Sequence, residues 1–333
     1  MPMSNQKFLL CATTLCVSAL CLTNMSFAEI PQTASGKPDL SGIWTTATLT
    51  PLERPENVSR EKKFSAEEMA AMSESAERSL TARSENPPPG SVGGYNREWL
   101  DPGMKALTDG RTALIYDPEN GRIPWQPSAK AESDAQRARY GIGPFDSFID
   151  MDTGERCLSD GITMAPLQPY NMNYQIFLTE DWLAINHEMY HEYRLIPLDG
   201  RPHIDSNLGQ WLGDARGHWE GDTLVVVSQG FADKSKDYWA WPWRKARPGL
   251  KLTERFTRID EKTIDYTFTV EDSEMFTQPW SASAPMTTDQ ASRGVTAGPL
   301  YEYACHEGNY ALPNVLRGAR LAEKQAGQSD TGG

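Results

Sequence analysis

The stretch LKLTERFTRIDEKTIDYTFTV, residues 250–270, contains two runs in which apolar and polar side chains alternate. Alternation with a period of two predicts a β-strand that has one buried face and one solvated face. The residues expected on the buried face are Leu252, Phe256, Ile264, Tyr266, Phe268 and Val270. Those expected in solvent are Thr253, Arg255, Thr257, Asp265, Thr267 and Thr269. The two runs therefore predict a pair of neighbouring antiparallel strands.

Short alternating runs separated by turns continue on both sides of this pair, from about residue 174 to residue 304. The runs are YQIFLT, WLAINHEMYHEYRLIPL, DTLVVVS, FTQPWSASA and LYEYAC. A long sheet with one apolar face tends to curl into a barrel or fold into a sandwich, because either arrangement removes exposed edges. We therefore expect a mainly β protein, built as an antiparallel β-barrel with flanking helices.

The N-terminal part of the chain predicts one strand and two helices. PDLSGIWTTATLTPL, which begins at Pro38, fits a first strand, and Ser65 with Glu68 forms a capping box that starts a helix. A second helix is expected from Ser128 to Arg139. We expect residues 29–170 to pack on a barrel core of residues 171–325 that includes a C-terminal helix, and residues 326–333 to be a disordered tail.

Residues 1–28 have the pattern of a secretory signal peptide. Lys7 is followed by an apolar run from Phe8 to Leu22 and then by Ser26-Phe27-Ala28, with small residues where a signal peptidase cleaves. The apolar run is shorter than the roughly 20 residues that a transmembrane helix needs. We expect cleavage after Ala28 and a periplasmic or secreted protein.

Cleavage would remove three of the five cysteines and leave only Cys157 and Cys305. Because a secreted protein folds in an oxidising compartment, these two are expected to form a disulfide bond. Such a bond would also anchor His306 and Glu307 near residues 155–160. The alternative is that one of the cysteines is a buried free thiol.

The charge of the chain limits its partners. The formal net charge is -13, and it becomes -14 without the signal peptide, which carries one lysine and no acidic residue. An acidic surface repels nucleic-acid phosphates and anionic lipid headgroups. We therefore expect no nucleic-acid partner and no stable membrane insertion. The partner expected from a barrel pocket lined by Tyr, Trp, Met and His is a small apolar or aromatic ligand or substrate.

Several phrases of the sequence resemble those of a family of uncharacterised secreted bacterial proteins. They are PDLSGIW at 38–44, DGRPH at 199–203, WEGDTLVV at 219–226, ERFTR at 254–258, FTQPW at 276–280 and EYACHEGNY at 302–310. This resemblance covers most of the mature chain and implies no activity. Separately, Gly42-Ile43-Trp44 is similar to the Gly-x-Trp opening of lipocalin-like (calycin) barrels, which implies a barrel that holds a small apolar ligand.

The candidate functional residues are concentrated in residues 181–222. This segment contains four of the five histidines, namely His187, His191, His203 and His218. His187-Glu188-Met189-Tyr190-His191 matches the H-E-x-x-H pattern of zinc hydrolases. On a helix, His187 and His191 rise only about 6 Å apart and would bind one zinc ion, whereas on a strand they lie about 13 Å apart. The local conformation therefore decides whether the two histidines can bind one metal ion or have a different role, such as acid–base catalysis.

The context of this motif favours a strand. Another apolar run precedes it, and Pro197-Leu198-Asp199-Gly200 after it is typical of a hairpin turn. On one continuous strand, His187, Met189, His191 and Tyr193 would share a face. The other face would carry Asn186, Glu188, Tyr190, Glu192 and Arg194.

A hairpin at Asp199-Gly200 would bring His191, Arg194 and His203 together. We therefore expect His191 and His203 to act as catalytic acid and base, and Arg194 to stabilise an anionic intermediate. The alternative for each histidine is a purely structural role, either hydrogen-bonded in the core or solvated at the rim. The alternative for Arg201 and Arg216 is an ion pair with Asp199, Asp214 or Glu220, and His218, beside the turn at Gly221-Asp222, is expected to be structural.

Six further residues are predicted to bind the substrate. Trp239 and Trp241 belong to the segment YWAWPWR, which either covers a pocket mouth as an aromatic flap or packs its own rings onto the barrel. The others lie on the histidine tract or near the second cysteine, and they are His187, Tyr193, Glu302 and His306.

Together these patterns predict an enzyme that performs acid–base chemistry on a small apolar or aromatic molecule, as a lyase, isomerase or hydrolase. Two alternatives stay open. One is a non-catalytic lipocalin-like carrier, and the other is a zinc hydrolase that uses His187, Glu188 and His191. Outside that last alternative we expect no cofactor and no metal.

Overall fold

The computed structural model describes residues 30–85, 100–139, 143–159, 170–205, 207–233 and 246–330. The predicted signal peptide and the YWAWPWR segment lie outside these residues. The α-helices are α1 (Ala66–Glu85), α2 (Pro127–Arg139) and α3 (Ala311–Asp330), and short 3₁₀ helices lie at Phe148–Asp150, Met189–His191 and Gln290–Arg293. The strands are β1 (Gly42–Thr45), β2 (Ile115–Asp117), β3 (Asn173–Leu178), β4 (Trp182–His187), β5 (Glu192–Pro197), β6 (Asp214–Glu220), β7 (Thr223–Gln229), β8 (Lys251–Arg258), β9 (Thr263–Glu271), β10 (Trp280–Ser283) and β11 (Met286–Thr287).

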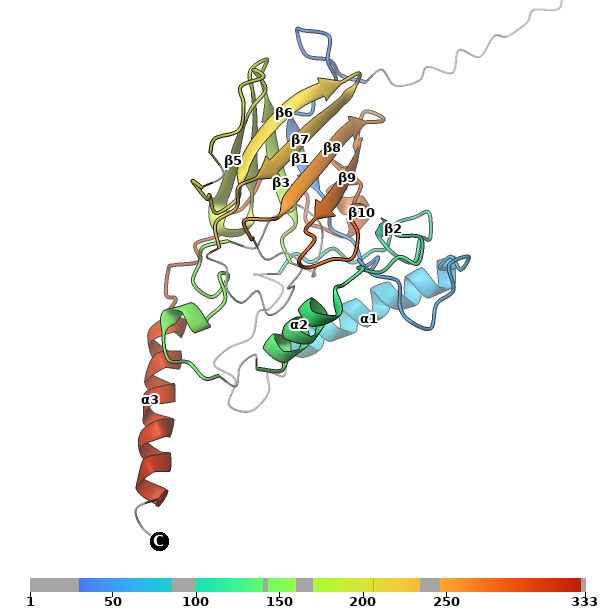
Figure 1. The fold of residues 1–333 in the computed structure, drawn as a ribbon. Helices are drawn as coiled ribbons and strands as arrows, with labels where there is room; N and C mark the ends of the chain where they lie inside the picture. Colours follow the sequence, from blue (N-terminus) through green and yellow to red (C-terminus); the bar gives the residue numbers. More distant parts are fainter. Residues whose placement is uncertain are drawn as a thin grey trace, which may run out of the picture.

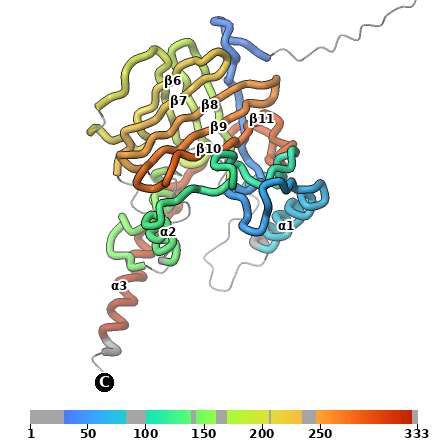
Figure 2. Tube along the Cα trace, turned by 45° about the vertical axis from the view of Figure 1, so that its right-hand side comes forward, coloured from blue at the N-terminus to red at the C-terminus, as the bar shows by residue number. Residues whose placement is uncertain are grey.

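The strands form one strongly curved, 11-stranded sheet whose pairings are all antiparallel (Figure 1). The main path runs β5-β4-β3-β1-β11-β9-β8-β7-β6, and β10 joins β9 to β2. Figures 1 and 2 show α1 and α2 near one end of the sheet and α3 extending away from it. The expected mainly β, antiparallel architecture with flanking helices is therefore confirmed.

The alternation in residues 250–270 is confirmed residue by residue. All six side chains expected on the buried face of β8 and β9 are buried, and they join a single apolar core. Large aromatic residues fill this core because each of them removes a wide apolar area from water. The fully buried aromatic residues are Trp44, Trp280, Tyr174, Tyr266, Phe231, Phe256 and Phe268.

The two ends of the sheet do not pair, so the closed barrel that we expected is not formed by hydrogen bonds. β5 and β6 are the terminal strands of the described sheet. Side chains contact across this junction at Gly217 of β6, where an added Cβ atom would overlap the Leu198 side chain that follows β5. We call this junction the seam.

The expected continuous strand across WLAINHEMYHEYRLIPL is wrong. β4 ends at His187, β5 begins at Glu192, and the two strands pair with each other in the register Trp182 to Pro197 and His187 to Glu192. The residues between them form a tight turn. The hairpin expected at Asp199-Gly200 is also absent, since the next described strand begins only at Asp214.

Two expectations near the C-terminus also change. The run LYEYAC forms no strand, and a disulfide bond holds it instead. α3 continues to Asp330, so it includes part of the tail that we expected to be disordered. Residues such as Leu, Ala, Glu, Lys and Gln favour a helix, and their propensity outweighs the cost of about 1 kcal/mol for a helical glycine such as Gly327.

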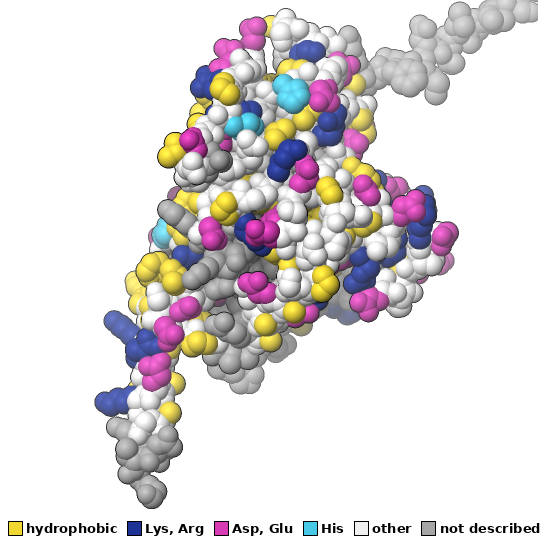
Figure 3. Space-filling model, viewed as in Figure 1, with side chains coloured by type: hydrophobic (Ala, Val, Ile, Leu, Met, Phe, Trp, Pro, Cys, Tyr) yellow, Lys and Arg dark blue, Asp and Glu magenta, His cyan; other side chains and the backbone are white. Residues whose placement is uncertain are grey.

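The helix predictions hold elsewhere. The capping box is formed, since the Ser65 backbone N–H donates to Glu68 Oε2 at 2.7 Å and the Glu68 N–H donates to Ser65 Oγ at 3.2 Å. Among the described helices, none is long and apolar enough to cross a membrane. Acidic and basic side chains are interspersed over the face seen in Figure 3.

Candidate functional site

The H-E-x-x-H tract lies in the turn that joins β4 to β5. Its backbone is unusual because Tyr190 and His191 have positive φ angles of 60° and 50°. Non-glycine residues seldom adopt this left-handed conformation, and such strain is often found at functional sites. Met189–His191 form a short 3₁₀ helix that is interrupted at Tyr190, and His187 still belongs to β4, so the α-helical spacing that the zinc alternative requires is absent. Within the described part of the chain, no group of three or more His, Cys, Asp or Glu residues could hold a metal ion.

The turn also changes which side chains face the core. His187 is 7% exposed and stacks on the Tyr174 ring at 4.6 Å between centroids, whereas Tyr193 is 67% exposed. The expected common face of His187 and Tyr193 is therefore wrong. A turn with two left-handed residues replaces strand alternation, so the register that connected these positions is lost.

Glu188, the second residue of the motif, carries a buried carboxyl group. It is 3% exposed, and Asn173 Nδ2 donates to its Oε2 at 2.9 Å. Burial raises the pKa of Glu188 to about 7; the Asn173 hydrogen bond opposes this shift and the nearby charge of Asp101 reinforces it. Burial likewise raises the pKa of Asp101. The Asp101 carboxylate is thus near enough for its charge to affect the pKa of Glu188.

The titration of Glu188 should make the stability of the protein depend on pH. A carboxyl group with a raised pKa in the folded state stabilises the fold at low pH, and this contribution is lost as pH rises from the ordinary value of 4.5 to about 7. The Glu188→Gln variant should lack the loss, which amounts to about 3 kcal/mol. Urea unfolding across this pH range in metal-free buffer measures it, and equal pH profiles for the two proteins would refute the assignment.

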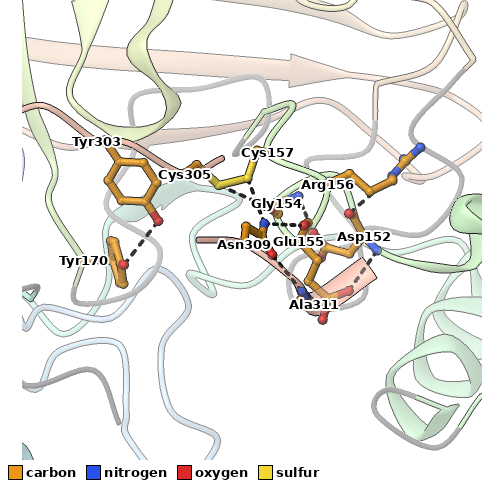
Figure 4. Close-up of a disulfide and its surroundings, with 10 residues drawn as sticks. All are labelled: Asp152, Gly154, Glu155, Arg156, Cys157, Tyr170, Tyr303, Cys305, Asn309 and Ala311. Atoms are coloured by element: carbon orange, nitrogen blue, oxygen red, sulfur yellow. Dashed lines mark hydrogen bonds between the residues drawn. A yellow bond between two sulfur atoms is a disulfide. The ribbon is translucent and has the colours of Figure 1, made fainter. Parts of the chain in front are cut away.

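The expected disulfide bond is confirmed. Cys157 and Cys305 are bonded, with Cα atoms 5.6 Å apart and a sequence separation of 148 residues. Asn309 Nδ2 contacts Cys157 Sγ at 3.1 Å (Figure 4). His306 and Glu302 lie on the exposed surface of this C-terminal segment.

The disulfide holds the C-terminal segment against the turn. The Tyr303 backbone N–H donates to His191 Nε2 at 3.3 Å, and the Tyr303 ring packs edge-on against Tyr190 at 5.1 Å. The hydroxyl groups of Tyr303 and Tyr170 are 3.2 Å apart (Figure 4). Because His191 Nε2 accepts a hydrogen bond, the neutral ring carries its proton on Nδ1.

Arg194 is engaged inside the curved sheet. Its guanidinium forms a two-pronged ion pair with Glu254 of β8, with Nη1 to Oε1 at 2.9 Å, and its Nη2 donates to Ser228 of β7 at 3.2 Å. Tyr266 donates from its hydroxyl to Glu254 Oε1 at 2.9 Å. Burial, and then the Glu254 charge, raise the pKa of Tyr266. This network joins β5 to β7, β8 and β9 across the interior.

His203 lies beside the start of β6 in a histidine–aspartate dyad. Its Nδ1 is 2.8 Å from Asp214 Oδ2, which also accepts from the Ile204 backbone N–H at 3.0 Å. Arg216 Nη1 donates to the other carboxylate oxygen at 2.6 Å, and Arg216 Nε donates to the Pro202 carbonyl at 3.0 Å. The Asp214 carboxylate is thus held by three groups. Its position fixes the His203 ring with the proton on Nδ1 and leaves Nε2 as the acceptor.

The structure therefore gives each expected catalytic residue a different partner. His191 contacts Tyr303, Arg194 contacts Glu254, and His203 contacts Asp214; no hydrogen bond or ion pair joins the three within the described ranges. Their convergence depended on a hairpin at Asp199-Gly200, which does not form. The ion pairs of Arg201 with Asp199 and of Arg216 with Asp214 are present. Trp239 and Trp241 lie outside the described residues.

Sequence reasoning missed three acidic residues that the structure places in clusters. Glu254 has the same parity in β8 as Leu252 and Phe256, so alternation alone places it inside. Asp214 precedes Arg216 by two residues and was considered only as an ion-pair partner. No sequence pattern pointed to Asp101, because it comes near Glu188 only when the chain has folded.

Comparison with known proteins found no matching family model, no similar curated protein and no similar solved structure. The geometry of the described residues is therefore the basis for the proposals that follow.

Proposed function

We propose that this protein is a periplasmic or secreted enzyme that performs acid–base chemistry on a small apolar or aromatic molecule, with His203 as the proton-transfer group. One observation carries the proposal, namely the His203 Nδ1 to Asp214 Oδ2 contact of 2.8 Å. A carboxylate at this nitrogen fixes the tautomer and stabilises the imidazolium ion that forms when Nε2 takes a proton. The disulfide bond supports a secreted location, because such bonds persist in oxidising compartments.

The surroundings of His203 suit such a substrate. The imidazole is partly exposed, so Nε2 can reach a ligand, while Asp214 and Arg216 are mostly shielded. The same loop exposes Ile204, Leu208 and Trp211. These side chains supply apolar surface on the loop that carries His203, which suits an apolar or aromatic substrate. In this proposal His203 removes a proton from the substrate at one position and returns it at another.

The other expected residues receive supporting roles. His191 holds the C-terminal segment through Tyr303, and Arg194 connects the strands across the interior. We further propose that the curved sheet is a lipocalin-like barrel in which side chains, rather than backbone hydrogen bonds, close the seam. The Arg194 contacts with β7 and β8 support this view, because they cross from one terminal strand to the other side of the sheet.

Two chromogenic probes test the proposal. 5-Nitrobenzisoxazole reports removal of a proton from carbon, and p-nitrophenyl acetate reports hydrolysis. Loss of a positioned acid or base typically lowers a rate by about 10²–10⁴-fold. We expect losses in this range for His203→Gln and for Asp214→Asn with at least one probe, because the asparagine no longer fixes the reactive tautomer.

His218→Gln is the matched control. His218 also contacts a carboxylate, Glu220, at 3.2 Å, but it is exposed and uses Nε2 for that contact. This variant should retain the wild-type rate. Equal rates for His203→Gln and wild type would contradict the assignment. Binding of the aromatic probe without any turnover would favour the carrier alternative.

A further inference from the structure

Arg216 of β6 contacts two separate parts of the His203 site through one guanidinium group. Its Nη1 donates to Asp214 Oδ1 at 2.6 Å, and its Nε donates at 3.0 Å to the carbonyl oxygen of Pro202, the residue that precedes His203. Nη1 also donates to the Ala215 carbonyl at 2.7 Å, so the group is held against its own strand. Arg216 thus connects the carboxylate that contacts the imidazole to the backbone that carries the imidazole.

The segment that carries His203 has few other contacts with the sheet. Within the described ranges, three hydrogen bonds join residues 202–204 to β6. Two of them, from the His203 ring and from a backbone N–H, end on Asp214 Oδ2, and the third runs from Arg216 to a backbone carbonyl. Arg216 therefore makes one of these bonds directly and holds the acceptor of the other two.

A second group of the same composition on the sheet shows what this arrangement adds. His218 Nε2 and Arg255 Nη2 contact the two oxygens of Glu220 at 3.2 and 2.7 Å. These three side chains are each at least 42% exposed, whereas none of the three in the His203 site is more than 24% exposed. In the described part of the chain, Arg255 also forms no hydrogen bond to the backbone. Exposed ion pairs fix geometry weakly, whereas shielded charge-assisted hydrogen bonds fix it firmly.

We propose that Arg216 is the positioning residue of the His203 site. It holds the Asp214 carboxylate in the orientation that keeps the proton of the neutral imidazole on Nδ1 and leaves Nε2 open to the substrate. Arginine suits this role because its donors project from a rigid plane, so two acceptors are fixed relative to each other. A lysine ammonium carries the same charge on a flexible stem and does not fix them. Arg216 acts through Asp214 and not on the substrate, and this inference rests on the proposed function.

NMR spectroscopy of the intact mature protein, labelled with ¹⁵N-histidine, tests the inference without a substrate. Long-range ¹H–¹⁵N spectra show which ring nitrogen carries the proton, and the His203→Gln variant assigns the signals. In the neutral wild-type ring, the proton should be on Nδ1 alone. In Arg216→Met and Arg216→Lys, the two ¹⁵N shifts should move toward an average of both tautomers. Arg255→Met is the matched control and should leave the His203 shifts unchanged.

Steady-state kinetics with the chromogenic probe that the wild type turns over provide a second readout. Arg216→Met should lower kcat by about 10²-fold, the size of effect that a displacement of about 1 Å can cause. KM should stay unchanged, because Arg216 does not contact the substrate. Arg216→Lys should not restore the rate, since it keeps the charge and loses the fixed geometry, and Arg255→Met should react like wild type.

The two readouts separate failure of this inference from failure of the proposed function. A wild type that turns over neither probe contradicts the proposed function, and the spectra still decide the role of Arg216. An Arg216→Met protein with a native circular dichroism spectrum and a single Nδ1-protonated tautomer would overturn the inference. So would an equal change of the His203 shifts in Arg255→Met. If Arg216→Met does not fold, Arg216→Lys decides, and wild-type shifts in that variant refute the role of the guanidinium.

Discussion

Arg194→Leu is expected to destabilise the protein by about 3–5 kcal/mol, because it leaves the Glu254 carboxylate buried without a cation. Glu254 is fully buried on β8, and among the described residues Tyr266 would be its one remaining hydrogen-bond donor. The lost ion pair also removes the connection from β5 to β7 and β8. Urea unfolding followed by fluorescence measures the change in the free energy of unfolding.

A double variant separates the charge effect from simple loss of packing. In Arg194→Met with Glu254→Leu, no charge remains in the interior, so at least half of the lost stability should return. Arg201→Leu serves as a control, since its ion pair with Asp199 is exposed to solvent and such pairs contribute less than about 1 kcal/mol. An Arg194→Leu variant as stable as the Arg201→Leu control would show that the interior network is dispensable.

Removal of the disulfide bond is the second large effect. The bond closes a loop across 148 residues of sequence. In the chain-entropy model, a loop of this length stabilises the fold by at most about 5 kcal/mol. The double variant Cys157→Ser with Cys305→Ser should lose most of that stability, as measured by urea unfolding.

The loss should also have a local component. Tyr303 lies two residues before Cys305 and supports both Tyr190 and His191. Hydrogen exchange at residues 188–191 should therefore accelerate on reduction, while β7 to β9 should stay protected under native conditions. The double serine variant should not respond to the reductant. Unchanged exchange in the turn of the reduced wild type would contradict the supporting role of the bond.

The sheet could largely be predicted because its signal is local. In β9 every second side chain is apolar, and in β8 Leu252 and Phe256 follow the same alternation, so the strand geometry alone converts this pattern into one buried face. The same rule places Glu254 inside. Its ion pair with Arg194 could not be predicted, because the two residues are 60 positions apart and meet only across the interior of the curved sheet.

The turn at Glu188 was missed for a different reason. Sharp turns are usually signalled by Gly, Asn or Pro, and His-Glu-Met-Tyr-His contains none of them. Contacts from distant parts of the chain, namely Asn173 on Glu188 and Tyr303 on His191, hold the left-handed residues in place. Tertiary structure here outweighs local preference, and the turn ends the common face on which His187 and Tyr193 were expected.

The seam between β5 and β6 makes one part of the sheet mechanically unlike the rest. Along most of the path, neighbouring strands are joined by ladders of backbone hydrogen bonds, so that separating them breaks many bonds at once; the shortest junctions are β1 with β11, which pair at Thr45 and Thr287, and β11 with β9, which pair at two positions. At the seam, Gly217 against Leu198 and the Arg194 network provide the described contacts. Local opening of the protein should therefore begin at the seam and give access to the apolar interior. A single arginine, Arg194, opposes this opening through its contacts with β7 and β8.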